Sequence, residues 1–489
     1  MTADFSGLAH ALLPEASLVA GALLVLGLDL AIFRARTAAF RLRAAAAVAS
    51  LAVVAAAGFA LVEGTPGEVF GGVIALDTLG LAARLGVLIL VLLTLGISTG
   101  ARLPRPAAEY VVVILFAACG MLLMADAQQL LLAFLAVELA SISLYVLAGF
   151  NSSSPKSAEA AVKYFLLGAM SAAFLLFGFS LLYGLTGTIE LTGIATSVAL
   201  MPFSPLLAVA LVMILVAFGF KVAAAPFHLW APDVYEGAPA PSAALIASAS
   251  KLAGFVFFTR LLWPGLGAVS GLYSGTVGGQ GWIPIALILS AASILLGNLV
   301  ALAQTDVRRL LAYSAIAHAG TLLLGVIASG VSGPGPLVYY ALTYGLATVG
   351  AFGVIAALDG SGGCRKITDL AGLHRRSPLL AGCLLVFVLS LAGIPPMAGF
   401  FGKFSVFAAA LKLGGLSGPV GWLVIAAILM SAVALYYYMV ILKQALVAAP
   451  RPEASAAVRV PPAAAFSLAA AAVLIVVLGL FPSLLLQWF

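Results

Sequence analysis

Apolar stretches of about twenty residues recur along the whole chain, separated by short polar links. A helix of this length crosses the hydrocarbon core of a bilayer. The stretches do not alternate apolar and polar positions, which excludes a membrane β-barrel. The pattern predicts fourteen membrane helices, at roughly Leu12–Phe33, Ala44–Leu61, Leu79–Ile97, Tyr110–Met124, Leu130–Phe150, Ala160–Leu185, Phe203–Trp230, Ala243–Leu262, Ile283–Ala303, Leu310–Ala328, Leu337–Leu358, Leu379–Leu411, Trp422–Leu446 and Ala463–Phe481.

The composition supports a membrane protein. Of the 489 residues, 64% are hydrophobic and 8% are charged, whereas soluble domains carry about 25% charged residues. Only helices or closed barrels satisfy every backbone polar group in lipid. We therefore expect an all-α polytopic bundle in which no link is long enough for a separate soluble domain.

The basic residues concentrate in alternate links. Sixteen of the 23 lysines and arginines lie in odd-numbered links, and three lie near even-numbered ones, namely Arg84, Arg260 and Lys412. Because short cytoplasmic loops carry the excess of Lys and Arg, the odd links should be cytoplasmic. Both termini should then lie on the outer side of the membrane.

Four lysines and one acid fall inside the predicted spans: Lys163, Lys221, Lys251, Lys403 and Glu138. A lysine at a helix centre costs about 2.5–3.5 kcal/mol, so the set costs on the order of ten kcal/mol. A lysine near a helix end can extend to the membrane surface, an explanation that stays open for Lys163. Glu138 is too short to do so, and we expect it to face the interior and pair with a base.

This excess of buried lysines favours transport. A structural ion pair explains one Glu–Lys pair, but it does not explain four lysines with a single mid-span acid. Desolvated lysines change their pKa readily, and a nearby acid favours the charged form. A row of such groups bridged by water can relay protons.

Prolines predict that two helices are broken. Lys221 lies five residues before Pro226 in FGFKVAAAPFHLW, and Pro395 and Pro396 come shortly before Lys403 in GIPPMAGFFGK. Broken helices at membrane depth line watery cavities, and transporters place ion sites there. A simple proline kink is the alternative in both the seventh and the twelfth span.

Two segments of the chain share a motif. DAQQLLLAFLAVE runs from Asp126 to Glu138, and DVRRLLAYSAIAH runs from Asp306 to His318. The first begins in an even link and the second in an odd one, so the motif enters the membrane from opposite sides. This predicts two inverted five-helix repeats at 109–266 and 282–448, flanked by a three-helix segment at 1–108 and a C-terminal helix at 460–489. Chance similarity of two Leu- and Ala-rich helices is the alternative.

His318 takes the place of Glu138 in the second copy of this motif. A lone histidine can be a neutral packing residue. Its match to Glu138 and its ordinary pKa near neutrality favour a role in proton transfer.

Other chemistry finds little support in the sequence. Cys119, Cys364 and Cys383 are too few and too scattered for a disulfide framework or a metal site. No nucleotide-binding, iron–sulfur or haem motif is present, and the net charge of +6 includes no basic run typical of nucleic-acid binding. We expect no cofactor and no metal in this chain.

These motifs resemble the antiporter-like membrane subunits of respiratory complex I and of the related multisubunit cation/proton antiporters. The similarity covers roughly residues 110–445. Its most specific part is PFHLWAPDVYEGAP, which follows Lys221. The other segments are ELASISLYVL, ASKLAGF, QTDVRRLLAYSAIAHAG and GIPPMAGFFGKF.

The resemblance implies fourteen helices, an inverted repeat and broken seventh and twelfth helices. It implies that Glu138 and Lys221 form the intake pair of a proton relay, that Lys251 and His318 are central, and that Lys403 is at the exit. Lys163 would lie near Glu138, and His228 would follow the first helix break.

Within that family the chain is most similar to the N-type subunit of bacterial NADH:quinone oxidoreductase. A subunit of this type would pump protons in the cytoplasmic membrane, with periplasmic termini, in response to redox chemistry elsewhere. It would bind no NADH, flavin or quinone. Its partners would be antiporter-like neighbours, small helical subunits and lipid in a hetero-oligomer, with no nucleic acid. A sodium/proton antiporter subunit and a scaffold with structural ion pairs remain the alternatives.

Overall fold

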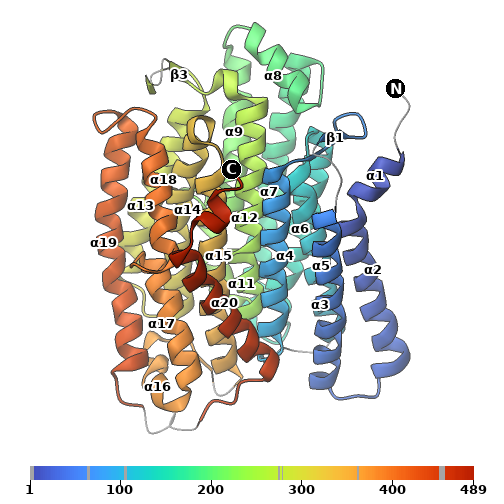
Figure 1. Cartoon of the computed structure of the whole chain (residues 1–489), viewed down its shortest axis with the longest axis vertical. Helices are drawn as coiled ribbons and strands as arrows, with labels where there is room; N and C mark the ends of the chain where they lie inside the picture. The colour runs from blue at the N-terminus through green and yellow to red at the C-terminus, as the bar shows by residue number, and fades with distance from the viewer. Residues whose placement is uncertain are drawn as a thin grey trace.

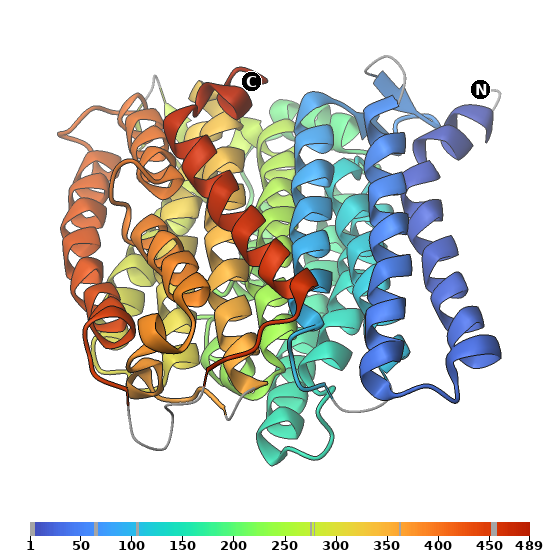
Figure 2. The same cartoon turned by 60° about the horizontal axis from the view of Figure 1, so that its bottom comes forward.

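The computed structural model describes residues 5–62, 67–103, 107–273, 276–277, 279–360, 363–450 and 457–489 (Figure 1). Two of the arginines in the charge count above, Arg105 and Arg451, lie outside these ranges. The described residues form a bundle of long, roughly parallel helices, and both chain ends lie at the same end of the bundle (Figure 2).

The predicted membrane helices are present. Thirteen helices in the described ranges are long and apolar enough to cross a membrane. They are α2 with its π-helical end η1 (Leu13–Phe33), α3 (Ala38–Val62), α4 (Thr78–Ser98), α5 (Ala107–Asp126), α6 (Leu130–Ala148), α7 (Pro155–Thr186), α9 (Pro205–Val222), α11–α12 with η2 (Ala240–Gly265), α13 (Trp282–Ala301), α14 (Val307–Ser332), α15 (Gly335–Asp359), α19 (Pro419–Leu446) and α20 (Pro462–Leu480). The remaining predicted span, the twelfth, consists of the shorter helices α17 (Pro378–Ala392) and α18 (Ala398–Leu411).

The links carry small elements that the hydrophobic pattern did not predict. An antiparallel hairpin joins β1 (Gly67–Val69) to β2 (Ile74–Leu76), and β3 (Leu272–Tyr273) pairs with β4 (Thr276–Val277). The short helices outside the predicted spans are α1 (Phe5–Ala11), α8 (Leu191–Leu200), η3 (Gly267–Val269), η4 (Ile367–Leu370), α16 (Leu373–Arg376) and α21 (Ser483–Leu486), whereas α10 (Trp230–Gly237) continues the seventh span. In Figure 1, α8 and β1 lie at the top of the bundle and α16 lies at the bottom.

Both predicted helix breaks are confirmed. The seventh helix stops at Val222, where Ala223 adopts a left-handed conformation (φ +58°), and resumes as α10 at Trp230. The twelfth stops at Ala392, where Gly393 is left-handed (φ +82°), and resumes as α18 at Ala398. A left-handed residue ends a helix because the chain then turns away from the axis.

The two broken helices also begin alike. Ser204 precedes Pro205 and accepts a hydrogen bond from the Leu207 amide, and Ser377 precedes Pro378 and accepts one from the Leu380 amide. Serine caps the free amides of a first helical turn, and proline fits the first helical position. Each helix therefore has a defined start and a defined stop.

A pair of isolated β-bridges marks equivalent points at opposite ends of the bundle. Gln129, just before α6, pairs with Glu190 near α8, and Asp306, just before α14, pairs with Lys366 near η4. The first bridge lies at the end that carries α8 and the second at the end that carries α16 (Figure 1).

A third break, which the sequence analysis did not predict, divides the eighth helix. Ser248 (φ −117°, ψ −83°) separates α11 (Ala240–Ala247) from α12 (Ala249–Arg260). Its backbone leaves the helical region three residues before Lys251. Only the tertiary structure reveals this break, since neither proline nor glycine marks it.

The centre of the bundle is formed by the eighth, tenth and eleventh helices. In their most apolar windows, 100%, 94% and 100% of residues are buried, against 33% in α3, α7, α19 and α20. Small residues allow close packing of central helices: a Cβ at Gly297 of α13 would lie 2.5 Å from the Ala317 amide of α14. Polar groups on the central helices are therefore shielded from the lipid.

Candidate functional site: a buried row of ionisable side chains

Glu138 and Lys221 line one cavity between α6, α7 and α9. The cavity has a volume of about 20 Å³, about the space that one ordered water needs. Lys221 is buried, and its Nζ donates a hydrogen bond to Ser141 Oγ at 2.9 Å. Glu138 is half-buried on the same helix as Ser141, and its charge interacts with that of Lys221. The base expected near Glu138 is therefore Lys221, with which it shares this cavity.

Lys251 lies at the centre of the bundle and is 1% exposed. Its Nζ donates a hydrogen bond of 2.6 Å to the Ala315 carbonyl of α14 and lies 5.7 Å from the Tyr344 ring centre. One turn further along α12, a Cβ at Gly254 would lie 3.5 Å from Lys221 Cγ. Glu138, Lys221, Lys251, His318 and Lys403 are called the row below. Helix α12 therefore contacts Lys221, the preceding lysine of the row, and α14, the helix that carries His318.

His318 is buried on α14 between two tyrosines. Its Nδ1 lies 2.6 Å from the Tyr340 hydroxyl on α15, and its Nε2 lies 3.0 Å from the Tyr438 hydroxyl on α19. Tyr438 also hydrogen-bonds Ser314, and the Tyr344 ring centre is 4.9 Å from that of His318. Both ring nitrogens of the histidine thus have hydroxyl partners.

Lys403 reaches across the break of the twelfth helix. Its Nζ, carried by α18, donates hydrogen bonds of 3.2 Å to the Leu391 and Ala392 carbonyls at the end of α17. Carbonyls in the last turn of a helix lack an intrahelical partner and attract a cation.

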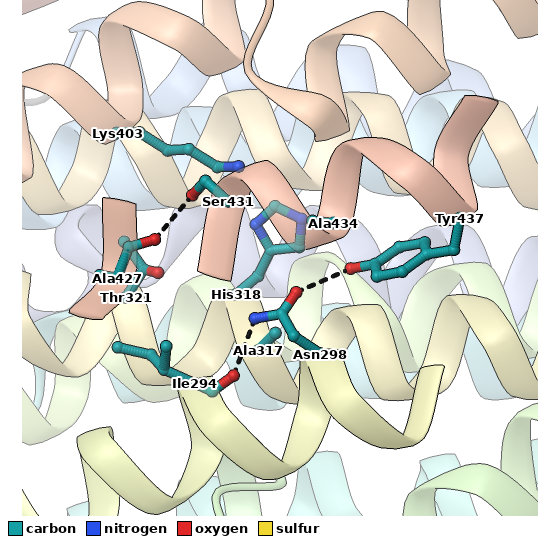
Figure 3. A pocket seen from close by; sticks show the side chains of 10 residues that line it. All are labelled: Ile294, Asn298, Ala317, His318, Thr321, Lys403, Ala427, Ser431, Ala434 and Tyr437. Carbon is teal, nitrogen blue, oxygen red and sulfur yellow. Dashed lines mark hydrogen bonds between the residues drawn. The ribbon is translucent and has the colours of Figure 1, made fainter. Parts of the chain in front are cut away.

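Lys403 and His318 line a second small cavity, of about 10 Å³ (Figure 3). Asn298 of α13 and Tyr437 of α19 bound the cavity and hydrogen-bond each other at 3.0 Å. His318 of α14 and Lys403 of α18 therefore face one cavity in the second half of the row.

Comparisons with known proteins identify the family of this chain. Residues 127–442 match the family described as NADH:quinone oxidoreductase/Mrp antiporter, transmembrane. "NADH-quinone oxidoreductase subunit N 2" of Acidobacterium capsulatum is 48% identical over 88% of this chain and 88% of its own length. "NADH-quinone oxidoreductase subunit N" of Moorella thermoacetica is 42% identical over 79% and 78%.

The chain belongs to this family of antiporter-like membrane subunits.

Two solved structures share its fold. A chain of respiratory complex I from Thermus thermophilus is 35% identical, with a TM-score of 0.79 over 97% of this chain and 98% of that chain. The Mrp complex of Dietzia sp. provides a chain that is 22% identical, with a TM-score of 0.81 over 100% and 96%. The second similarity shows the fold alone.

Lys163 differs from what the resemblance implied for an antiporter-like subunit. Instead of lying beside Glu138, its Nζ pairs with Asp233 of α10 at 2.5 Å and with Glu159 at 2.6 Å, and its side chain is 41% exposed. The lysine is two turns into α7, so its long side chain reaches the end of the helix, as the snorkelling interpretation allowed.

His228, which the resemblance implied would follow the first helix break, lies between α9 and α10. It is buried, and its Nδ1 has no hydrogen-bond partner among the described residues. His228 is not among the residues that line the Glu138–Lys221 cavity.

The partners of Lys163 belong to an ion-pair network that links the two halves of the antiporter-like subunit. Arg309 of α14 contacts Asp233 at 2.6 Å and Glu236 at 3.0 Å, and Glu236 also pairs with Lys156. Burial would raise the pKa of Asp233, but hydrogen bonds from Lys163 and Arg309 outweigh it and hold that pKa below its ordinary value. Asp233 therefore stays ionised at neutral pH.

A second ion-pair cluster lies at the opposite end of the bundle. Arg84 of α4 approaches Asp126 at 3.1 Å and Glu15 at 3.7 Å, while Arg260 of α12 makes two hydrogen bonds of 2.7 and 2.8 Å to Asp77. The sequence analysis placed Arg84 and Arg260 beside links, yet both arginines are buried. Apolar neighbours along the chain gave no indication of these distant acids.

The described ranges contain no group of three or more His, Cys, Asp or Glu side chains that could hold a metal ion. The buried row itself consists of ammonium, imidazole, carboxyl and hydroxyl groups.

The structure adds hydroxyl-bearing residues that sequence reasoning missed. Ser141, Tyr340 and Tyr438 hydrogen-bond predicted relay residues, and Ser314 hydrogen-bonds Tyr438. Tyr438 lies in a run of three tyrosines within the thirteenth span. That run is visible in the sequence, but tyrosine is common in membrane helices and the run does not show which hydroxyl faces inward.

Proposed function

We propose that this chain is the N-type proton-pumping subunit of a bacterial NADH:quinone oxidoreductase and that Glu138, Lys221, Lys251, His318 and Lys403 carry the proton. The observation that supports this most is the row itself. Lys221, Lys251, His318 and Lys403 are each at most 9% exposed, and each is held by hydroxyl or carbonyl oxygens rather than by a carboxylate at ion-pair distance.

This arrangement suits transfer better than structural support. A lysine in a buried salt bridge is held in one protonation state by its partner, whereas a lysine held by neutral oxygens can release its proton when a neighbouring charge changes. Among the described residues, Glu138 is the one carboxylate that lines the two small cavities of the row. Sodium prefers oxygen ligands such as carboxylates, so the row suits protons better than sodium.

The remaining predicted residues take peripheral roles in this proposal. Lys163, with Asp233 and Arg309, forms a charged mouth where protons are taken up. His228 lies in the break of the seventh helix, after Lys221 in the chain. The segments 109–266 and 282–448 act as two inverted half-channels, joined at Lys251 and His318.

We further propose that the subunit lies in the cytoplasmic membrane with periplasmic termini. The end of the bundle that carries α16 holds most of the basic links and faces the cytoplasm. Redox cofactors belong to other subunits of the hetero-oligomer, and this chain responds to their reaction through neighbouring membrane subunits.

The test uses the whole enzyme in membrane vesicles. Glu138→Gln and Lys221→Met should lower proton uptake per NADH oxidised in assembled complexes, and Lys412→Met, at an exposed position, should not. Normal pumping by both relay variants would refute the proposal. A sodium-dependent flux that persists without redox substrates would favour a sodium/proton antiporter instead.

A further inference from the structure

His318 is bracketed by two hydroxyl groups that come from different helices. Tyr340 of α15 is 2.6 Å from Nδ1, and Tyr438 of α19 is 3.0 Å from Nε2. Both tyrosines are almost completely buried, at 1% and 0% exposure. Neither nitrogen is in contact with a lysine or a carboxylate in the described structure, so any proton reaching or leaving the ring passes a hydroxyl or a water.

The further contacts of the two tyrosine hydroxyls lie in opposite directions along α14. Tyr438 hydrogen-bonds Ser314, four residues before His318, and Tyr340 interacts with Thr321, three residues after it. Seven residues span about 10 Å along a helix axis. The Tyr340 ring also packs on α18 at Gly402, next to Lys403, because a Cβ there would be 2.5 Å from Tyr340 Cδ2.

The chemistry of these groups fits a relay. A neutral imidazole donates from one nitrogen and accepts at the other, and a tyrosine hydroxyl can do both at once. A histidine with a hydroxyl on each nitrogen can therefore take a proton at one nitrogen and release a proton from the other without turning its ring.

We propose that Tyr438 and Tyr340 are the direct proton-transfer partners of His318, with Tyr438 on the Ser314 side and Tyr340 on the Lys403 side. This deepens the relay proposed above and rests on it.

The step balances as a displacement along one hydrogen-bond chain. Ser314 passes its hydroxyl proton to Tyr438 and recovers one from the proton being pumped. Tyr438 gives its own hydroxyl proton to Nε2, and Nδ1 gives its proton to Tyr340. Tyr340 passes its original proton on towards Thr321 and Lys403. Each hydroxyl ends with as many protons as before, whereas the imidazole ends as its other tautomer, with its proton on Nε2 instead of Nδ1. One proton has then moved from one side of the ring to the other, and the ring returns to its first tautomer before the next transfer.

The direct test removes each hydroxyl while keeping the ring. Tyr438→Phe and Tyr340→Phe should lower the ratio of protons pumped to NADH oxidised to the value found for His318→Ala, in assembled complexes in vesicles. Matched controls are Tyr436→Phe, which is exposed on α19, and Tyr339→Phe, whose hydroxyl donates to the Leu478 carbonyl instead. Both controls should keep the wild-type ratio.

A second measurement separates transfer from positioning. A fluorotyrosine placed at position 438 keeps the shape of the ring and its hydrogen bond but makes the hydroxyl more acidic. Under the proposal, the pH profile of pumping should move to lower pH, whereas a hydroxyl that only orients the histidine would leave the profile in place.

The outcomes distinguish the two proposals. Wild-type ratios in both Phe variants, together with a loss in His318→Ala, would overturn the role of the tyrosines and leave the relay intact. Wild-type pumping by His318→Ala would overturn the relay through His318. An unchanged pH profile with fluorotyrosine would reduce Tyr438 to a positioning residue, contrary to the proposal.

Discussion

At the scale of single residues, the lysines of the row differ in whether the carbonyl groups they bind would keep another hydrogen bond after the lysine is replaced. Lys251 donates to the Ala315 carbonyl in the middle of α14, and a mid-helix carbonyl keeps its own intrahelical hydrogen bond. Lys403 donates to carbonyls in the last turn of α17, which have no such bond. The same substitution should therefore affect stability differently at the two positions.

Lys251→Met should abolish proton pumping without lowering the thermal stability of the assembled complex. Methionine fills a similar volume, and it removes a buried ammonium group whose desolvation is costly. Thermal unfolding and proton uptake measured on the same preparation check this prediction. A large drop in melting temperature would mean that Lys251 serves the structure instead.

Lys403→Met should also stop pumping, but it should lower stability by about 1–3 kcal/mol, the cost of leaving buried polar groups unsatisfied. The comparison with Lys251→Met in the same unfolding assay provides the control. Equal melting temperatures for the two variants would contradict the assigned role of the α17 carbonyls.

At the scale of elements, the breaks explain why lysines can be held in the membrane. Lys221 lies in the last turn of α9, and Lys403 reaches the last turn of α17. The C-terminal end of a helix carries a partial negative charge that favours a cation. In both broken helices, the end of the first half therefore lies beside an ammonium group.

The C-terminal helix α20 supports the second of these breaks. A Cβ at Gly479 would lie 2.0 Å from the Pro396 carbonyl oxygen and 2.7 Å from the Ala398 amide. Only glycine permits this approach. The position of the break, and with it the position of Lys403, therefore depends on α20.

Gly479→Ala should push α20 and the break apart, lower stability by about 1–3 kcal/mol as overpacking does, and reduce pumping. Gly382→Ala is the matched control, because a Cβ there meets nothing within 4 Å and alanine favours a helix by up to about 1 kcal/mol over glycine. Proton uptake and melting temperature measure both variants. Equal proton uptake and equal melting temperatures in the two variants would show that α20 does not fix the position of the break.

At the scale of the whole molecule, the two ion-pair clusters connect parts of the bundle that are distant in sequence. Asp233 and Arg309 join the seventh helix to the tenth at one end. Arg260 of α12 binds Asp77, which directly precedes α4, at the other.

The orientation of the bundle can be tested by labelling introduced cysteines, because the native cysteines of the chain should not react. Cys119, Cys364 and Cys383 are buried, and burial raises the pKa of the Cys364 thiol, which keeps it protonated and unreactive. We predict that Ser417→Cys reacts with a membrane-impermeant maleimide from outside intact cells, whereas Ser152→Cys reacts only in inverted vesicles. Both serines are exposed, in links at opposite ends. The reverse labelling pattern would place the termini in the cytoplasm.

Much of this organisation was predictable from the sequence. The membrane spans follow from the length of apolar stretches, and the breaks of the seventh and twelfth helices follow from Pro226, Pro395 and Pro396. The ionisable residues of the row were found because charge within an apolar stretch is conspicuous. These features are local, and each can be recognised within about twenty residues.

The tertiary structure decided how those residues are connected. Lys163 pairs with Asp233 instead of lying near Glu138, and His318 meets Tyr438, 120 positions away. The break at Ser248 and the burial of Arg84 likewise have no local signal. An apolar pattern fixes that a helix is in the membrane, but it does not fix which face of that helix meets which neighbour. Packing of the whole bundle settles that choice, and it alone determines which hydroxyl, carbonyl or acid reaches each buried charge.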